Sequence, residues 1–193
     1  QIRLFGIVFL SLCTVITVWS VWSSYRFAEK QREKIYVLDN GKSLMLALSQ
    51  DLSQNRPAEA REHLRRFHEL FFTLSPEKSA IEHNVRRALL LADRSVYNYY
   101  SDFAEKGYYN RIIAGNITQV LKVDSVVCDF EHYPYRATTY ATQQIIRQSN
   151  VTERSLVTTC RLLNASRSDD NPNGFTIEGF TIIENKDLQT VKR

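Results

Sequence analysis

Histidine is the side chain best suited to metal binding and to proton transfer near neutral pH. The four in this sequence are His63, His68, His83 and His132. His63 and His68 lie five apart in a segment of helical periodicity, whereas two metal ligands on one helix face need a spacing of four. We therefore expect both to be exposed helix residues. HExxH, CxxC, GxGxxG, P-loop and GxSxG strings are also absent from the sequence, so we predict no catalytic residue, no bound cofactor and no metal ligand.

A tyrosine-rich stretch is the second candidate for chemistry. It contains Tyr97, Tyr99, Tyr100, Phe103, Tyr108 and Tyr109. Helices over a curved sheet can enclose a cone-shaped pocket in which a tyrosine hydroxyl acts as a donor. The nearby carboxylates, Asp102 and Glu105, look solvent-facing, so core packing and partner contacts explain the tyrosines better than catalysis does. Stacking on single-stranded nucleic acid, helped by Arg111, is a minor alternative.

The charge pattern argues little for or against nucleic acid. Arg3 and Arg26 are the only charged residues before position 27, and removing them from the total of +4 leaves +2 for the rest. Lysine and arginine alternate with aspartate and glutamate, without the basic stripe that is typical of DNA-binding domains.

The N-terminal segment reads as a membrane span. Residues 4–22, LFGIVFLSLCTVITVWSVW, carry no charge, and extension to Tyr25 gives 22 residues. A helix of that length measures roughly 33 Å, close to the thickness of a bilayer's hydrocarbon core. Trp19, Trp22 and Tyr25 are spaced like an interfacial aromatic belt. The run is longer than the core of a signal peptide and has no convincing A-x-A site, so we predict a retained anchor over residues 4–25.

The orientation of this anchor stays open at this point. Arg26, Lys30, Arg32 and Lys34 follow the span, whereas only Arg3 precedes it. This bias favours a cytoplasmic C-terminal side, but large domains cross membranes largely regardless of charge.

Helical patterns dominate the next part of the chain. Residues 35–41 indicate a short extended piece and a turn, residues 43–52 a helix, and Pro57 the first position of the next helix. That helix carries an apolar stripe at helical spacing. The stripe consists of Ala60, Leu64, Phe67, Phe71 and Leu74.

Two further helical segments follow. Ser75 and Pro76 predict a helix start, and apolar residues continue at helical spacing from Ile81 to Ala92. Residues 96–113 then predict one segment that Gly115 closes.

The pattern changes after residue 118. Segments rich in Val, Ile, Thr and Tyr span residues 119–133, 136–148, 152–164 and 175–185. Their short connections predict an antiparallel meander. Helices first and strands second predict an α+β domain, with helices packed on one face of a curved four-stranded sheet.

The strand positions bear on the cysteines. Cys128 and Cys160 fall in the first and third of these strands, which a meander separates by roughly 9–10 Å. A disulfide needs Cα atoms within about 7 Å. We therefore expect two buried free thiols, and a bridge only if the strand order differs; Cys13 lies within the apolar run.

The chain resembles a known family. The anchor, the stretch Tyr36-Val-Leu-Asp-Asn-Gly-Lys42, the string Ala92-Asp-Arg-Ser-Val96 and the tyrosine-rich helix resemble the TraK proteins of Bacteroides-type conjugative transposons. TraK is similar to the bitopic inner-membrane scaffold proteins of type IV secretion systems, whose periplasmic domains have an NTF2-like (cystatin-like) α+β fold.

The resemblance implies an organisation of the chain. Residues 1–3 would end a cytoplasmic tail, residues 4–25 would cross the bacterial inner membrane, residues 26–41 would link, and residues 42–193 would form the periplasmic domain. It implies self-association and contacts with other channel subunits during DNA transfer, and it carries over no catalytic residue.

Two other functions remain as alternatives. One is an extracytoplasmic ligand-sensing domain, which sequence well beyond Arg193 would favour. The other is an NTF2-like pocket enzyme, which a deep pocket with a buried carboxylate beside Tyr97 or Tyr100 would favour.

Overall fold

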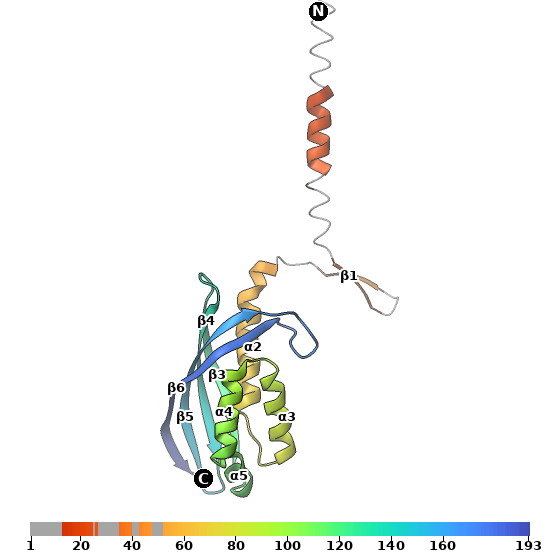
Figure 1. Cartoon of the computed structure of the whole chain (residues 1–193). Coiled ribbons are helices and arrows are strands. Elements are labelled where there is room, and N and C mark those ends of the chain that lie inside the picture. Colours follow the sequence, from red (N-terminus) through yellow and green to blue (C-terminus); the bar gives the residue numbers. More distant parts are fainter. Residues whose placement is uncertain (1–12, 25, 27–34, 40–42, 48–51) are drawn as a thin grey trace, which may run out of the picture. The chain divides into compact units, whose positions relative to one another are not determined.

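The chain divides into two units, Gln1–Asn55 and Arg56–Arg193. The computed structural model describes residues 13–24, 26, 35–39, 43–47 and 52–193 (Figure 1).

The first unit contains a helix over residues 13–24 with exposed side chains. Thr17 donates its hydroxyl to the carbonyls of Cys13 and Thr14, at 3.0 and 2.9 Å, as hydroxyls in apolar helices commonly do. Among the described residues, no helix combines the length and the apolar character that a membrane crossing requires. Residues 4–12 and 25 of the predicted span lie outside the described residues.

A small hairpin follows in the same unit. Strand β1 (Ile35–Asp39) pairs antiparallel with β2 (Ser43–Ala47). The extended piece is confirmed over residues 35–39. The helix predicted over residues 43–52 is wrong for 43–47, because ladder bonds to the neighbouring strand override the local helix propensity of Leu, Met and Ala. Residues 48–51 lie outside the described residues.

The long helix α2 (Leu52–Phe72) carries the predicted stripe from Ala60 to Phe71, whereas Leu74 lies beyond the helix, in a β-bridge with Gln119. Ala60, Leu64 and Phe67 are fully buried, as amphipathic packing requires. Pro57 lies inside this helix and not at its first position. The prediction failed because residues 52–56 already form the first turns, where a missing N–H removes a single bond.

Three shorter helices complete the first layer: α3 (Lys78–Leu89), α4 (Arg94–Glu105) and α5 (Tyr108–Ala114). Glu77, and not Ser75, is the N-cap of α3 and makes no side-chain capping bond. The single segment predicted over residues 96–113 is two helices, because Gly107 adopts φ +66° between them. Gly115 is the C-cap of α5, as expected.

The second layer is one antiparallel sheet of four strands in the order β3-β4-β5-β6. The strands are β3 (Thr118–Asp129), β4 (Tyr135–Ile146), β5 (Asn150–Asn164) and β6 (Phe175–Lys192). The predicted meander is confirmed, and β6 runs further than residue 185. Figure 1 shows the helices gathered on one side of the curved sheet.

The strand register explains the two cysteines of this unit. Cys128 of β3 and Cys160 of β5 both have Ala137 of β4 as their register partner. One strand therefore separates them, and both are free thiols. Cys160 is buried and Cys128 half-buried; burial raises their pKa values to about 12 and about 11. This is the strand order from which two buried free thiols were expected; Cys160 is buried, whereas Cys128 is only half-buried.

Candidate functional site

The two faces of the sheet differ in what they offer a ligand or partner. Side chains of β4 alternate strictly: Ala137, Thr139, Ala141, Gln143 and Ile145 are buried under the helices. The β4 side chains between these buried residues point away from the helices. We call the face of the sheet that they form, together with the side chains beside them on β3, β5 and β6, the open face.

Beneath the helices, His63 and His68 are buried, with exposed fractions of 1% and 0%. The prediction that they are exposed is wrong, because both point toward the sheet beside the apolar stripe. Nδ1 of His68 donates to the Leu64 carbonyl and Nε2 accepts from the Thr158 hydroxyl, both at 2.7 Å. A neutral imidazole satisfies both bonds.

The surroundings of both rings favour the uncharged form. Burial lowers the pKa of His68 to about 4 and that of His63 to about 4. Nε2 of His63 lies 3.3 Å from the Leu91 carbonyl, and the ring of His68 stacks on Phe72. The two histidines therefore act as core residues.

The tyrosine cluster is part of the same core. The Tyr108 hydroxyl donates to Oε1 of Gln119 at 2.6 Å, and Gln119 donates onward to the Phe72 carbonyl at 2.7 Å. The Tyr99 hydroxyl accepts from the Ile182 amide at 3.3 Å. Only Tyr97 is exposed, at 52%. Core packing, the interpretation favoured from the sequence, is confirmed for the rest of the cluster.

One hydroxyl in this cluster has no partner. Tyr109 Oη is buried without a hydrogen bond, and burial with the neighbouring Tyr100 and Tyr108 raises its pKa. No carboxylate is among the buried polar residues of the described part, and Asp102 and Glu105 are exposed, as expected. The feature that would favour an enzyme, a buried carboxylate beside Tyr97 or Tyr100, is thus not found in the described residues.

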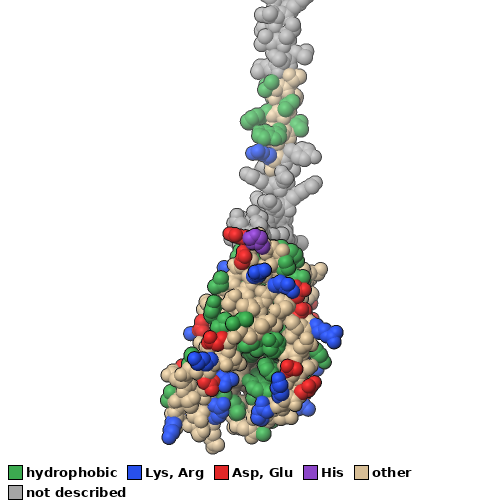
Figure 2. Space-filling model, turned by 60° about the vertical axis from the view of Figure 1, so that its left-hand side comes forward, with side chains coloured by type: hydrophobic (Ala, Val, Ile, Leu, Met, Phe, Trp, Pro, Cys, Tyr) green, Lys and Arg blue, Asp and Glu red, His purple; other side chains and the backbone are tan. Residues whose placement is uncertain are grey.

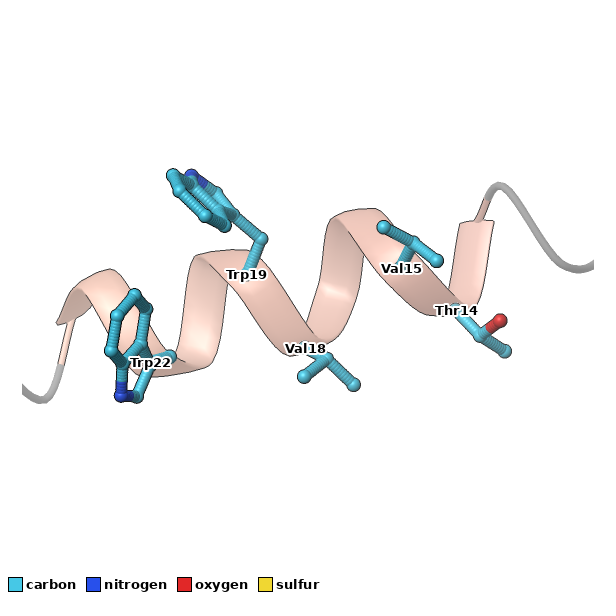
Figure 3. Close-up of a pocket in the computed structure, with 5 residues that line it drawn as sticks. All are labelled: Thr14, Val15, Val18, Trp19 and Trp22. Carbon is cyan, nitrogen blue, oxygen red and sulfur yellow. The ribbon is translucent and has the colours of Figure 1, made fainter.

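The helix of the first unit presents a hollow lined by Thr14, Val15, Val18, Trp19 and Trp22. Figure 3 shows that all five side chains project from one helix. The hollow is therefore a stretch of apolar helix surface and not an enclosed site.

The open face carries a wider, shallow groove of about 450 Å³. Its walls are Val120, Lys122, Asp124, Thr142, Gln144, Glu153 and Leu188. Both charge signs and two apolar side chains line it, so no single ligand chemistry dominates. On the face of the molecule that Figure 2 shows, side chains of both charge signs surround a central gathering of hydrophobic side chains.

The open face also exposes large apolar side chains. They are Val120, Val127, Tyr140, Leu188 and Val191, which are 39–61% exposed. The register places Tyr140 opposite Val157 and Val191 opposite Val151 on this face. Sequence reasoning missed this surface, although the pairs Val120-Leu121 and Val126-Val127 break the alternation and so put one apolar residue on each face.

The loop before β6 is fixed to the start of the second unit by arginine. Arg56 lies 3.7 Å above the Phe175 ring and donates to the Asn173 and Gly174 carbonyls at 2.8 and 3.1 Å. Arg167 binds both oxygens of Glu59 at 2.8 Å. Burial raises the pKa of Glu59, but bonds from Arg167 and Arg56 outweigh it, and the pKa lies below its ordinary value.

Comparison with known proteins identifies solved structures that have this architecture. No family model and no curated protein matches the chain. Among solved structures, the soluble domain of TrwG from the type IV secretion machinery of Bartonella grahamii matches with a TM-score of 0.51 and 18% identity, over 65% of this chain and 92% of that one. This chain shares its fold.

Two further structures agree. A TrwG component of the type IV secretion system from Bartonella birtlesii matches with a TM-score of 0.51 and 18% identity, over 65% of this chain and 90% of that one. TraE, solved with 2-(2-furyl)isonicotinic acid, matches with a TM-score of 0.51 and 16% identity, over 64% and 93%. At such identities the likeness concerns the fold, and it confirms the expected NTF2-like α+β architecture.

Proposed function

We propose that the chain is a non-enzymatic scaffold subunit of a conjugative type IV secretion system, of the TraK kind. The observation that carries this proposal is the fold shared with TrwG and TraE. The strings at residues 36–42 and 92–96, which resemble TraK, support the narrower assignment to Bacteroides-type conjugative transposons.

In this proposal, residues 4–25 anchor the chain once in the bacterial inner membrane, and the C-terminal domain lies in the periplasm. The uncharged run at residues 4–22 supports the anchor. An anchor confines the domain near the bilayer and raises its effective concentration for weak self-association. Small and hydroxyl residues of the run, among them Gly6 and Ser11, would help helices to approach each other in the membrane.

The open face is the surface that we assign to other channel subunits or to further copies of the chain. Exposed aromatic and aliphatic side chains such as Tyr140 and Val127 supply the apolar contact area that interfaces need. Lys122–Asp124 and Arg161–Glu178 pair on this face, so part of its charge is internally compensated. The proposal therefore assigns channel assembly to the chain.

Affinity purification with crosslinking tests the proposal. The full chain would be expressed in a conjugative donor, crosslinked in the membrane and purified, and bound proteins identified by mass spectrometry. We expect secretion ATPases or channel subunits to be recovered. Recovery of the chain alone would overturn the scaffold assignment.

A pair of variants tests the surface. Tyr140→Lys puts a charge on the open face, and Leu90→Lys puts one on the C-cap residue of α3, which is 55% exposed. We expect Tyr140→Lys to lower both the recovery of partners and the conjugation frequency by at least about tenfold, since a charge buried in an interface costs several kcal/mol. Leu90→Lys should behave as wild type; equal defects in the two would argue against the open face.

A further inference from the structure

The connection between β3 and β4 brings together three side chains that can bind a metal. They are Asp129, Glu131 and His132, and all three are exposed. One ligand atom from each, two carboxylate oxygens and one imidazole nitrogen, can be chosen so that all lie within 4.8 Å of one another. The sequence carries a signal for this group, because carboxylates lie one and three residues before His132, after a run of β-branched residues.

The geometry of the group leaves ligand atoms available. The Glu131 amide donates to Asp129 Oδ1 at 2.9 Å, which orients that carboxylate. Its other oxygen lies 3.8 Å from His132 Nδ1, too far for a hydrogen bond. Two ligand atoms bound to one tetrahedral zinc lie about 3.3–3.6 Å apart. A small side-chain rotation therefore brings these two atoms to the separation that a shared cation imposes.

The charge of the group also favours a cation. In the part of the chain that the structure describes, neither Asp129 nor Glu131 forms an ion pair with lysine or arginine, and the only pairing of Asp129 is the long one to His132. Arg136 is the register partner of Asp129 but makes no ion pair with it. With a neutral imidazole the group carries two uncompensated negative charges within a few ångströms.

We propose that Asp129, Glu131 and His132 bind one divalent transition-metal ion of the zinc type. Mixed imidazole and carboxylate ligands suit Zn²⁺ better than Mg²⁺ or Ca²⁺, which prefer oxygen alone. Water completes the coordination, because the site is open to solvent. This inference does not depend on the proposed secretion function.

Isothermal titration of ZnCl₂ into the purified full chain in detergent tests the site. The protein carries no polyhistidine tag, is stripped of metal, and has Cys13→Ser, because an exposed thiol would compete for zinc. We expect one saturable site. In the same background, His132→Ala and Asp129→Asn should each weaken binding at least about tenfold, whereas His83→Ala, which removes another exposed histidine, should leave it unchanged.

Circular dichroism of each variant checks that the fold is intact, as expected for exposed residues at a hairpin end. The proposal is overturned if the parent protein shows no saturable zinc binding. It is equally overturned if folded His132→Ala binds as tightly as the parent, or if His83→Ala loses as much affinity as His132→Ala.

Discussion

Acidification provides the sharpest test of how His63 and His68 are buried. Both rings are neutral in the folded chain, with pKa values lowered from 6.5 to about 4. In the unfolded chain both titrate near 6.5. Between these values the unfolded state binds more protons, so the free energy of unfolding is greatest above pH 6.5 and falls as the pH drops toward 4.

The size of the effect follows from the same pKa values. Between pH 8 and pH 5, linkage gives a loss of about 2 kcal/mol for each histidine, or about 4 kcal/mol for both. The carboxylates with lowered pKa do not interfere in this range. Glu59 and Asp187 have pKa values below their ordinary 4.5 and 3.8, and so remain ionised above pH 5.

Urea unfolding of the full chain in detergent, followed by far-ultraviolet circular dichroism, measures this loss. His68→Phe should halve the decrease, because a phenyl ring fits among Phe67, Phe72 and Phe180 and does not titrate. The control His83→Gln alters an exposed ring and should keep the full decrease. A free energy of unfolding that stays constant between pH 8 and 5, or a wild-type decrease in His68→Phe, would refute the assignment of buried neutral rings.

Three further predictions concern the core and the backbone. Phe67→Ala should lower the free energy of unfolding by about 3–5 kcal/mol, because it empties a fully buried site; Tyr97→Ala, an exposed position, should lower it by under about 1 kcal/mol in the same urea titration. Gly107→Ala should cost about 1 kcal/mol through its positive φ, and Gly107→Asn less, so equal thermal shifts would contradict the backbone argument. The double variant Cys128→Ser/Cys160→Ser should migrate as wild type on non-reducing gels, and a mobility change would contradict the strand order.

Sequence periodicity predicted the parts of the fold in which one physical requirement dominates. The stripe from Ala60 to Phe71 could be placed because amphipathic helices bury one face. The meander could be placed because short polar turns separate β-branched runs. The separation of Cys128 and Cys160 by one intervening strand followed from that topology alone.

The failures occurred where a tertiary contact outweighs the local signal. Residues 43–47 have helix-forming side chains but pair with β1. Burial of His63 and His68 could not be predicted, because it depends on Leu91 and Thr158, which are distant in sequence. The break at Gly107 was readable as a glycine within a helical pattern, but only the structure gives its φ.

The candidate surfaces were harder to predict than the fold. Apolar residues on the open face, such as Val127, look like core residues in a sequence, because hydrophobicity does not tell which side of a strand is covered. The group at Asp129, Glu131 and His132 depends on side-chain directions at a hairpin end, which strand periodicity does not specify.

The three cysteines differ in burial, so their rates of modification by a thiol reagent can report on opening of the fold. Cys13 is exposed, Cys128 half-buried and Cys160 buried, so a thiol reagent should modify them in that order. Because the pKa of Cys160 is raised to about 12, its thiolate forms at an appreciable rate only when the strands separate. The rate at which Cys160 is modified would thus report how often the second unit opens. The exposed Cys13 would serve as the internal control for the reactivity of the reagent.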